Sequence, residues 1–498
     1  MFVLPGQEKN FLFQVVNSMP PGTIDTSALA TDNINNPRTM NAIYQVGTRQ
    51  AIAAKEELSG GNLDLLGTSE NMNVPHVLKD GADSVGIAGA LARVYFSIGE
   101  YHKEWLEHFN LLVGGKPQSP LSVAEAKKNS PYVRATLDRL DNVAKFFVAA
   151  SKPHPLAKAS GSERFLQDSD ATVARGQKMF AENCAACHVS YNKMPQPPPK
   201  VERETKAWDD WTRSADFKSK MTALARDPDF LNDNYLSTDR RYPVSQIGSN
   251  VCAALASNAM RGHVWDNFSS ETYKKLPASE PVGVKDPFTG EESRYILPGG
   301  GRGYLRVPSL VSLWASAPYL HNNSVGLFNG DPSVAGRMAA FQDGIEKLLW
   351  WEKRLDMGSI YRTTETSWLT IDGSYLPEPL FKALKAKGLG MPGADNVLRL
   401  GPIPKGTPVN LLANIDLEIS FDLVKLANFA ELAIKLNAAL NDIRNLDETA
   451  TAARLKELVP DLLKVSKCRD FVTDRGHLFG AGLADDDKRA LIAYLKRL

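Results

Sequence analysis

The chain is poor in several features that would assign a protein to a class at once. Its 498 residues include four cysteines and eight histidines, and no uncharged apolar run reaches eighteen residues, so no transmembrane segment is expected. The 58 basic and 57 acidic residues leave a net charge of +1, which gives no reason to expect nucleic acid or an anionic membrane as a partner. The apolar fraction, 43%, is ordinary and can fill a sizeable core.

Two of the scarce cysteines and one of the scarce histidines stand together. Cys184, Cys187 and His188 form a C-x-x-C-H motif, which is typical of c-type haem attachment. Two thiols three positions apart lie on one side of a helical turn and can add to the two vinyl groups of a porphyrin. The next residue, His188, then lies under the ring as proximal iron ligand. A thioredoxin-like pair needs no adjacent histidine, and a zinc site needs a second Cys or His pair close by, so we predict one covalent haem c.

The flanks of the motif agree with this interpretation. Gly176 and Phe180 precede Cys184 at helical spacing, in an amphipathic segment that begins near Ala171. The chain ends in a second amphipathic segment, 483–498, with acidic residues first and basic residues last, as suits the helix dipole. One face of this segment carries Leu491, Tyr494, Leu495 and Leu498. The pair resembles the terminal helices of a cytochrome c domain, in which a glycine on the first helix lets the last helix cross closely.

Read in order, the chain predicts a mainly α fold. We expect an irregular, Asn-rich start to about residue 50, helices over 51–113 and 132–150, and a domain boundary in the Ser/Gly/Lys-rich stretch 151–170. Residues 192–245 predict long loops with a helix that is solvated on one face, and 332–465 predict further helices, with strong apolar periodicity over 415–445. That periodicity rests on Leu423, Leu426, Phe429, Leu432, Ile434 and Leu440.

The expected organisation is an N-terminal helical region, 1–160, followed by a cytochrome c-like haem domain, 161–498. The second part would contain a large, loop-rich insertion at about 192–470. Roughly three hundred residues then separate the haem helix from the closing helix, several times what a minimal cytochrome needs. The additional chain must build something beyond an electron carrier.

Three motifs carry a resemblance to a known family. They are Pro308-Ser309-Leu310, the stretch Ala317-Pro-Tyr-Leu-His-Asn-Asn-Ser324, and Asp474-Arg-Gly-His-Leu-Phe-Gly480. Together they resemble the di-haem cytochrome c peroxidase superfamily, and within it the rubber oxygenase branch, which cleaves polyisoprene with dioxygen. Family members carry two C-x-x-C-H sites, whereas one is present here. It fits the second, C-terminal haem, so the resemblance implies that the first site would fall just upstream of Met1 and that region 1–160 is the remnant of a first cytochrome c-like domain. The alternative is a mono-haem relative; we favour a missing upstream part, because the absence of a signal peptide points the same way.

The sixth iron ligand has several candidates, since a histidine, a methionine or an open position are all chemically possible. We favour His477, which matches the family's distal histidine, and whose neighbours Gly476 and Gly480 let backbone lie close to a flat ring. The alternative is that His477 is a loop histidine with a purely structural hydrogen bond. The other candidates are Met260, His263 and His321.

Further site residues are expected from the same resemblance or from residue type. His321 suits a contact to a haem propionate or to a group that orients an iron ligand. Arg302 and Arg306 suit pairing with haem propionates, or they are exposed loop arginines. His263 and Trp265 suit either a route between haems or core packing. The candidates for a catalytic oxygen pocket at a first haem are Tyr95, Phe96, Trp105 and Phe109, which otherwise form a core-facing aromatic stripe.

Covalent haem attachment is normally completed outside the bacterial cytoplasm, so we expect a periplasmic or secreted protein. Met1–Lys9 show no basic segment followed by an apolar run, so the signal peptide is expected upstream of the given chain. In an oxidising compartment Cys252 and Cys468 could pair, or they could remain buried thiols.

Three functions fit these observations. The first is a c-type haem oxidoreductase that serves oxygenase chemistry on an apolar or hydrocarbon substrate. The second is a hydrogen peroxide-reducing peroxidase, which would need a polar acid-base group near an open iron. The third is a plain electron carrier that exchanges electrons with a redox partner protein, which would leave the long insertion unexplained.

Overall fold

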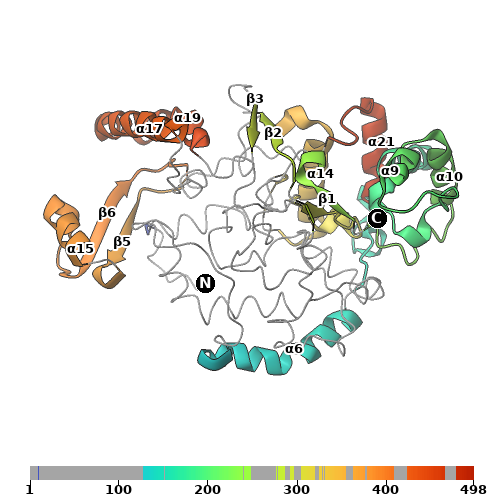
Figure 1. The fold of residues 1–498 in the computed structure, drawn as a ribbon, viewed down its shortest axis with the longest axis horizontal. Coiled ribbons are helices and arrows are strands. Elements are labelled where there is room, and N and C mark those ends of the chain that lie inside the picture. Colours follow the sequence, from blue (N-terminus) through green and yellow to red (C-terminus); the bar gives the residue numbers. More distant parts are fainter. Residues whose placement is uncertain are drawn as a thin grey trace.

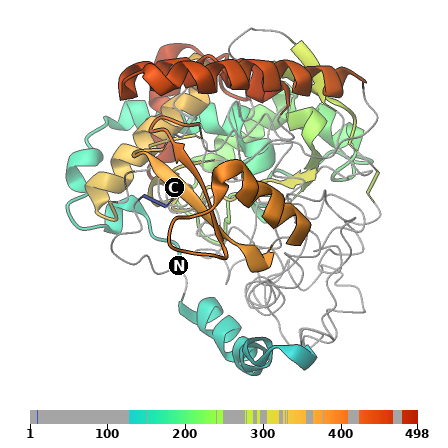
Figure 2. The ribbon, with the colours of Figure 1, turned by 90° about the vertical axis from the view of Figure 1, so that its left-hand side faces the viewer.

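The structure is a computed structural model of the whole chain. It describes residues 9–10, 127–150, 152–238, 240–247, 276–277, 279–285, 292–295, 304–319, 325–327, 329, 331–354, 363–375, 378–408, 423–465 and 478–498. Helices predominate among these residues (Figures 1 and 2), which confirms the mainly α prediction. The helices are α6 (Pro131–Ala150), α7 (Asp170–Asn183), α8 (Ala185–His188), α9 (Lys206–Thr212), α10 (Ala215–Ala225), α11 (Val244–Ile247), α14 (Val334–Leu349), α15 (Glu378–Leu384), α17 (Leu423–Asp442), α18 (Glu448–Lys456), α19 (Val459–Lys464) and α21 (Asp485–Leu495).

Helix α7 and the last helix, α21, are shaped by their first turns. At the start of α7 the Ser169 side chain accepts a hydrogen bond from the backbone N–H of Thr172, and Asp170 follows in the first turn. Helix α21 has three aspartates in its first turn and basic residues just beyond its end. Both patterns satisfy or complement the exposed N–H groups and the dipole of a helix N-terminus. The helices predicted from about 171 and over 483–498 are therefore confirmed.

The two helices cross in direct contact at Gly176. A Cβ atom at this position would overlap the backbone carbonyl of Ala490 and would lie 2.9 Å from the Cβ of Tyr494. Only glycine permits that approach. The rings of Phe180 and Tyr494 then meet with centroids 5.4 Å apart, and Leu491 is buried beside them. The predicted close crossing is confirmed.

Ion pairs fix both ends of the crossing. Arg175 Nε lies 2.7 Å from Asp487 Oδ1, and Lys496 Nζ lies 2.6 Å from Asp168 Oδ2. The second pair joins the residues just before α7 to those just after α21. Its Lys496 side chain is largely buried, so it is less screened by solvent than the exposed first pair.

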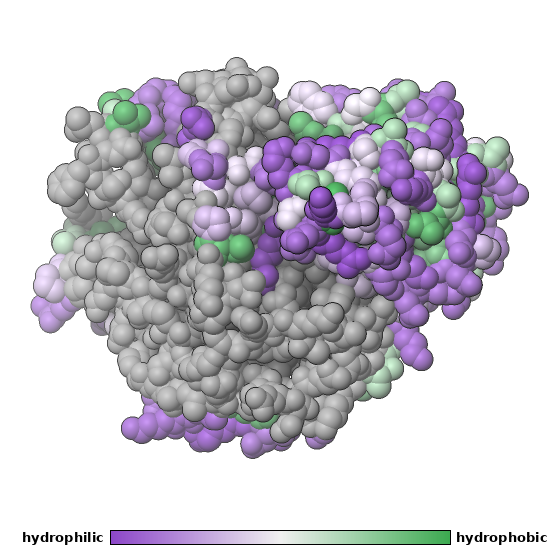
Figure 3. Space-filling model, turned by 45° about the vertical axis from the view of Figure 1, so that its right-hand side comes forward, coloured by the Kyte–Doolittle hydropathy of each residue, from purple (hydrophilic) through white to green (hydrophobic). Residues whose placement is uncertain are grey.

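An apolar core gathers around this crossing. Helix α10 packs against α7, and α14 packs against the 3-10 turn Leu313–Ala315. The core includes Phe180, Trp208, Met221, Phe341 and Leu495. Figure 1 shows α9, α10 and α21 together on one side of the molecule, and on that side the described surface is mostly hydrophilic with scattered apolar residues (Figure 3). Segments far apart in sequence thus share one interior.

The segment 192–245 is more ordered than its composition predicts. It holds two helices, α9 and α10, rather than one, and both tryptophans of α9 are buried, Trp208 at 1% and Trp211 at 8% exposure. Their rings meet edge to face at 5.2 Å, and Trp211 meets Phe217 in the same way at 5.1 Å. The predicted helix with one solvated face is confirmed in α9, since its two tryptophans, three positions apart, face the core while the side chains of Lys206 and Asp210 are exposed.

The strands form two-stranded antiparallel ribbons. They are β1 (Arg241–Pro243) with β4 (Tyr304–Arg306), β2 (Val282–Lys285) with β3 (Glu292–Tyr295), and β5 (Ser367–Asp372) with β6 (Val397–Ile403). The third ribbon corrects the prediction of helices alone over 332–465. Residue 9 bonds to this ribbon from outside, since Trp368 N in β5 donates to Lys9 O at 2.8 Å.

Helices α17, α18 and α19 form a separate layer near the end of the chain, with α17 running along one edge of the molecule (Figure 2). Leu432 is buried at 5% exposure but Ile434 is 73% exposed. Two positions along a helix turn the side chain by about 200°, so Ile434 does not belong to the apolar face to which we assigned it. None of the helices in the described residues is long and apolar enough for a membrane span.

Gly176→Ala is expected to destabilise the folded protein by about 1–3 kcal/mol, because the added methyl must push α21 away. This penalty exceeds the gain of about 1 kcal/mol that alanine brings in a helix interior. Gly482→Ala is the control, since open space surrounds that glycine and its effect should stay within about 0.5 kcal/mol. Denaturant unfolding of both variants makes the comparison; equal stability of Gly176→Ala and wild type contradicts the packing described here.

Candidate functional site

The C-x-x-C-H motif follows α7 without a break in hydrogen bonding. Cys184 ends α7, its N–H donating to Phe180 O at 2.8 Å, and α8 begins at the next residue. The N–H groups of Cys187 and His188 both donate to Cys184 O, at 3.1 and 2.9 Å. This tight turn holds the three motif residues on one short segment, which follows directly after the core-packed helix α7.

Both thiols are half-buried and neither is in a disulfide. Burial, with a smaller contribution from the nearby Cys187, raises the pKa of Cys184 to about 12. Burial also raises the pKa of Cys187. Both sulfurs therefore carry their proton at neutral pH, and Cys184 packs against the apolar core.

The His188 ring is oriented by a backbone carbonyl from a distant segment. Its Nδ1 lies 3.1 Å from the carbonyl oxygen of Pro308. A carbonyl oxygen can only accept, so Nδ1 carries the hydrogen. In the neutral imidazole the lone pair then lies on Nε2, the nitrogen that would bind a metal. The Pro308-Ser309-Leu310 motif thus has a physical role that the sequence alone did not show.

Buried serines hold the Pro308 carbonyl in place. Ser309 Oγ donates to Tyr235 O at 2.8 Å, and Ser237 Oγ donates to Val307 O at 2.6 Å. These bonds lock the segment 307–309 to the segment 235–238. The latter is in turn tied to the motif, because Thr238 N donates to Cys187 O at 2.9 Å.

The start of the 235–238 segment is fixed by a similar set of bonds. Ser190 Oγ, two residues after His188, donates to Asn234 Oδ1 at 3.1 Å and accepts from Tyr235 N at 2.8 Å. Both polar side chains are buried. Since each buried group is paired, the loop is held in one conformation without leaving a polar group unsatisfied.

A charged cluster lies beside Cys187. The Sγ atom of Cys187 lies 3.5 Å from the hydroxyl oxygen of Tyr242. The guanidinium of Arg240 lies 4.6 Å from the centroid of the same tyrosine ring and forms a two-pronged ion pair with Asp209. Burial raises the pKa of Tyr242. Burial is the largest single effect on Arg240 and would lower its pKa, but the hydrogen bond to Asp209 and the charge interactions with Tyr242, Asp209 and Tyr191 together raise it. Sequence reasoning missed this cluster, because nothing in the spacing of 209, 240 and 242 marks them as neighbours.

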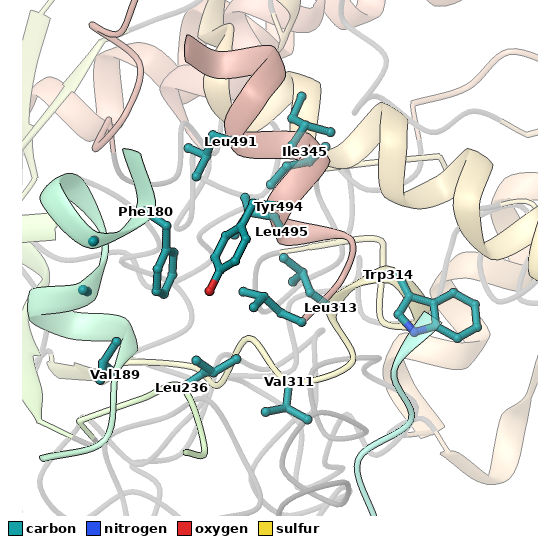
Figure 4. Close-up of a cluster of buried hydrophobic side chains, with 14 of the residues drawn as sticks. Phe180, Val189, Leu236, Val311, Leu313, Trp314, Ile345, Leu491, Tyr494 and Leu495 are labelled. Carbon is teal, nitrogen blue, oxygen red and sulfur yellow. The ribbon is translucent and has the colours of Figure 1, made fainter. Parts of the chain in front are cut away.

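The apolar surroundings of the motif fit a flat, largely hydrophobic cofactor. Figure 4 shows Phe180, Val189, Leu236, Val311 and Leu313 converging with side chains of α21. All of these are buried. Two protonated thiols, an imidazole with its lone pair on Nε2 and an apolar wall are the groups that covalent haem requires. The residues present therefore fit a haem c.

Most of the other predicted site residues lie outside the described residues, so their place relative to the motif stays a prediction. These are Tyr95, Phe96, Trp105, Phe109, Cys252, Met260, His263, Trp265, Arg302, His321, Cys468 and His477. For Arg306 the structure describes the backbone, in β4, but not the side chain. The second motif of the resemblance is described as far as Tyr319, whose ring packs against Gly344 of α14.

Comparison with known proteins agrees with this geometry. A family model described as cytochrome c matches residues 173–242, which include most of α7, the C-x-x-C-H motif, α9, α10 and the first two residues of β1. No curated protein and no solved structure gave a match. The chain therefore contains a cytochrome c domain, and such a domain implies covalently bound haem c and haem-based electron transfer or oxidoreduction.

Ser309→Ala is expected to lower the free energy of unfolding by about 1–3 kcal/mol, because the buried Tyr235 carbonyl loses its donor. The Pro308 carbonyl should also drift from His188, which weakens the electron donation of the imidazole and raises the haem reduction potential.

Ser316→Ala is the matched control for this variant. Ser316 is equally buried and donates to Leu313 O at 3.0 Å, but it is not bonded to the 235–238 segment. The Ser316→Ala variant should lower the free energy of unfolding by a similar amount and leave the haem reduction potential unchanged. Unfolding curves and a redox titration distinguish the two; an unchanged potential in Ser309→Ala contradicts the role given to the Pro308 carbonyl.

Proposed function

We propose that Cys184 and Cys187 attach one haem c, that His188 ligates its iron, and that this haem transfers electrons in a c-type haem oxidoreductase. The observation that carries the proposal is the His188 Nδ1–Pro308 O hydrogen bond of 3.1 Å. It selects the tautomer whose Nε2 can bind iron. A histidine in a redox dithiol pair would need no such orientation.

The residues of the chain have separate tasks in this proposal. Each protonated thiol adds its S–H across one vinyl double bond, so attachment needs no oxidant and releases nothing. His188 keeps one proton on Nδ1, facing Pro308 O, in both redox states. Phe180, Leu491 and Tyr494 exclude water from the side of the motif nearest the helix crossing. When bound, the haem supplies a one-electron couple whose potential depends on its ligands and its burial.

For the reaction, we propose oxygenase chemistry on an apolar substrate, as in the rubber oxygenase branch that the chain resembles. Support comes from the motifs 308–310 and 317–324, since the first of them contacts His188. A further support is the length of the chain, 498 residues, which exceeds the need of a carrier. A peroxidase remains the second candidate. It predicts turnover of hydrogen peroxide with a reduced partner, where an oxygenase predicts dioxygen uptake with a hydrocarbon.

The attachment prediction is tested on the full chain matured in a host that attaches c-type haem. The intact mass should exceed that of the polypeptide by one haem. Cys184→Ala and Cys187→Ala should each retain one thioether, which shifts the pyridine haemochrome band toward that of a haem with one free vinyl group. The double variant should carry no covalent haem. Wild-type protein at the bare polypeptide mass contradicts the proposal.

We also propose His477 as the sixth iron ligand, with a low-spin bis-histidine spectrum. His477→Ala should convert the resting absorption spectrum to high spin. The control is His154→Ala, because the His154 side chain is exposed and stacks on Trp314 at 5.7 Å. A spectrum that His477→Ala leaves unchanged transfers the role to another of the candidates named above.

A further inference from the structure

The cluster beside Cys187 has a layered geometry. Tyr242 places its hydroxyl oxygen 3.5 Å from Cys187 Sγ, and Arg240 Nη1 lies 3.4 Å from that same oxygen. The Arg240 guanidinium covers one face of the Tyr242 ring and binds Asp209 with both of its terminal nitrogens. A single tyrosine therefore separates a full ion pair from the second attachment sulfur.

The ion pair is largely shielded from solvent. The side chain of Arg240 is 12% exposed and that of Asp209 is 24% exposed. Two further contacts hold Arg240: its Nη2 donates to Glu204 O at 3.4 Å, and its backbone carbonyl accepts a hydrogen bond from Val307 N at 3.2 Å. The second contact joins the cluster to the segment that orients His188. Charges held in this way are weakly screened and act over several ångströms.

We propose that Arg240 and Asp209 form a positioning pair that sets the reduction potential of the haem by keeping the charge beside Cys187 balanced. The proposal rests on the proposed function, since it needs a haem joined to Cys187. Neither residue binds the iron or touches substrate. They act through the electrostatic field on the Cys187 side of the haem site and through Tyr242.

The physical argument gives opposite signs for the two partners. Reduction adds one electron to the haem, so an unpaired positive charge nearby favours the reduced state and an unpaired negative charge disfavours it. Asp209→Asn leaves Arg240 unbalanced and should raise the potential. Arg240→Gln leaves Asp209 unbalanced and should lower it. With both changes the pair carries no net charge, as in wild type, and the potential should return close to the wild-type value.

The chain offers a matched control on the same helix. Lys206 and Asp210 of α9 also form an ion pair, 2.9 Å long, but their side chains are 90% and 57% exposed. Asp210→Asn makes the same change in net charge as Asp209→Asn, one position further along the chain. Solvent screens the resulting imbalance, so the potential should stay at the wild-type value.

The experiment is a spectroscopic redox titration of the full haem-loaded chain in wild type and the four variants. Asp209→Asn and Arg240→Gln should change the equilibrium constant for reduction about tenfold in opposite directions, which is about 59 mV for a one-electron couple. Higher salt should leave most of the difference in place, since the pair is shielded.

The outcomes separate this proposal from the one on which it rests. Absence of covalent haem in wild type overturns the proposed function. Haem-loaded single variants whose equilibrium constants lie within about twofold of wild type, or that move in the same direction as each other, overturn the charge-balance role alone. Loss of haem from both single variants and the double variant, with retention in Asp210→Asn, assigns the pair to haem retention and also overturns it. Circular dichroism checks that each variant is folded.

Discussion

The close approach of α7 and α21 at Gly176 is the contact on which the rest of the domain depends. It exists because one side chain is missing: the backbone of Ala490 occupies the place that a Cβ at position 176 would take. From there Phe180 and Tyr494 pack ring against ring, and α7 runs straight into the C-x-x-C-H turn. The last helix of the chain thereby forms the wall behind the motif, although the two are far apart in sequence.

A second constraint acts on the other side of the motif. Two short segments, 234–238 and 307–309, are bonded to each other and to the motif through buried serines, an asparagine and backbone groups. Their combined effect is to aim the Pro308 carbonyl at His188 and to bring residues 240–242 against Cys187. The helices thus supply the apolar wall, and the loops supply the polar groups that orient the histidine and balance the charge. A cytochrome c domain needs both, because an apolar wall alone selects neither the tautomer of the imidazole nor the potential of the iron.

The sequence predicted the parts of this site that depend on local spacing. The C-x-x-C-H turn and the apolar face of Leu491 and Tyr494 follow from residue spacing, the close crossing at Gly176 follows from the resemblance to a cytochrome c domain, and the structure agrees with all three. It could not predict the Pro308 carbonyl as a partner of His188, because a backbone acceptor leaves no trace in residue type. Nor could it predict that Asp209 meets Arg240, since a contact across 31 positions depends on how the intervening loop folds. The second helix in segment 192–245 and the β5–β6 ribbon were missed for a related reason: tertiary packing outweighs the local charge pattern in the first and helix propensity in the second.

The central claim is that α7, which leads into the C-x-x-C-H motif, and the last helix, α21, form one cooperative unit. Hydrogen exchange of the haem-loaded chain, read by mass spectrometry on peptides from α7, α21 and the β5–β6 ribbon, measures this directly. Leu491→Ala removes a buried side chain from α21 and should lower the opening free energy of that helix by about 2–5 kcal/mol. The account predicts an equal fall in the protection of α7 and a smaller one in the β5–β6 ribbon. Protection of α7 that stays at its wild-type level while α21 opens would contradict it.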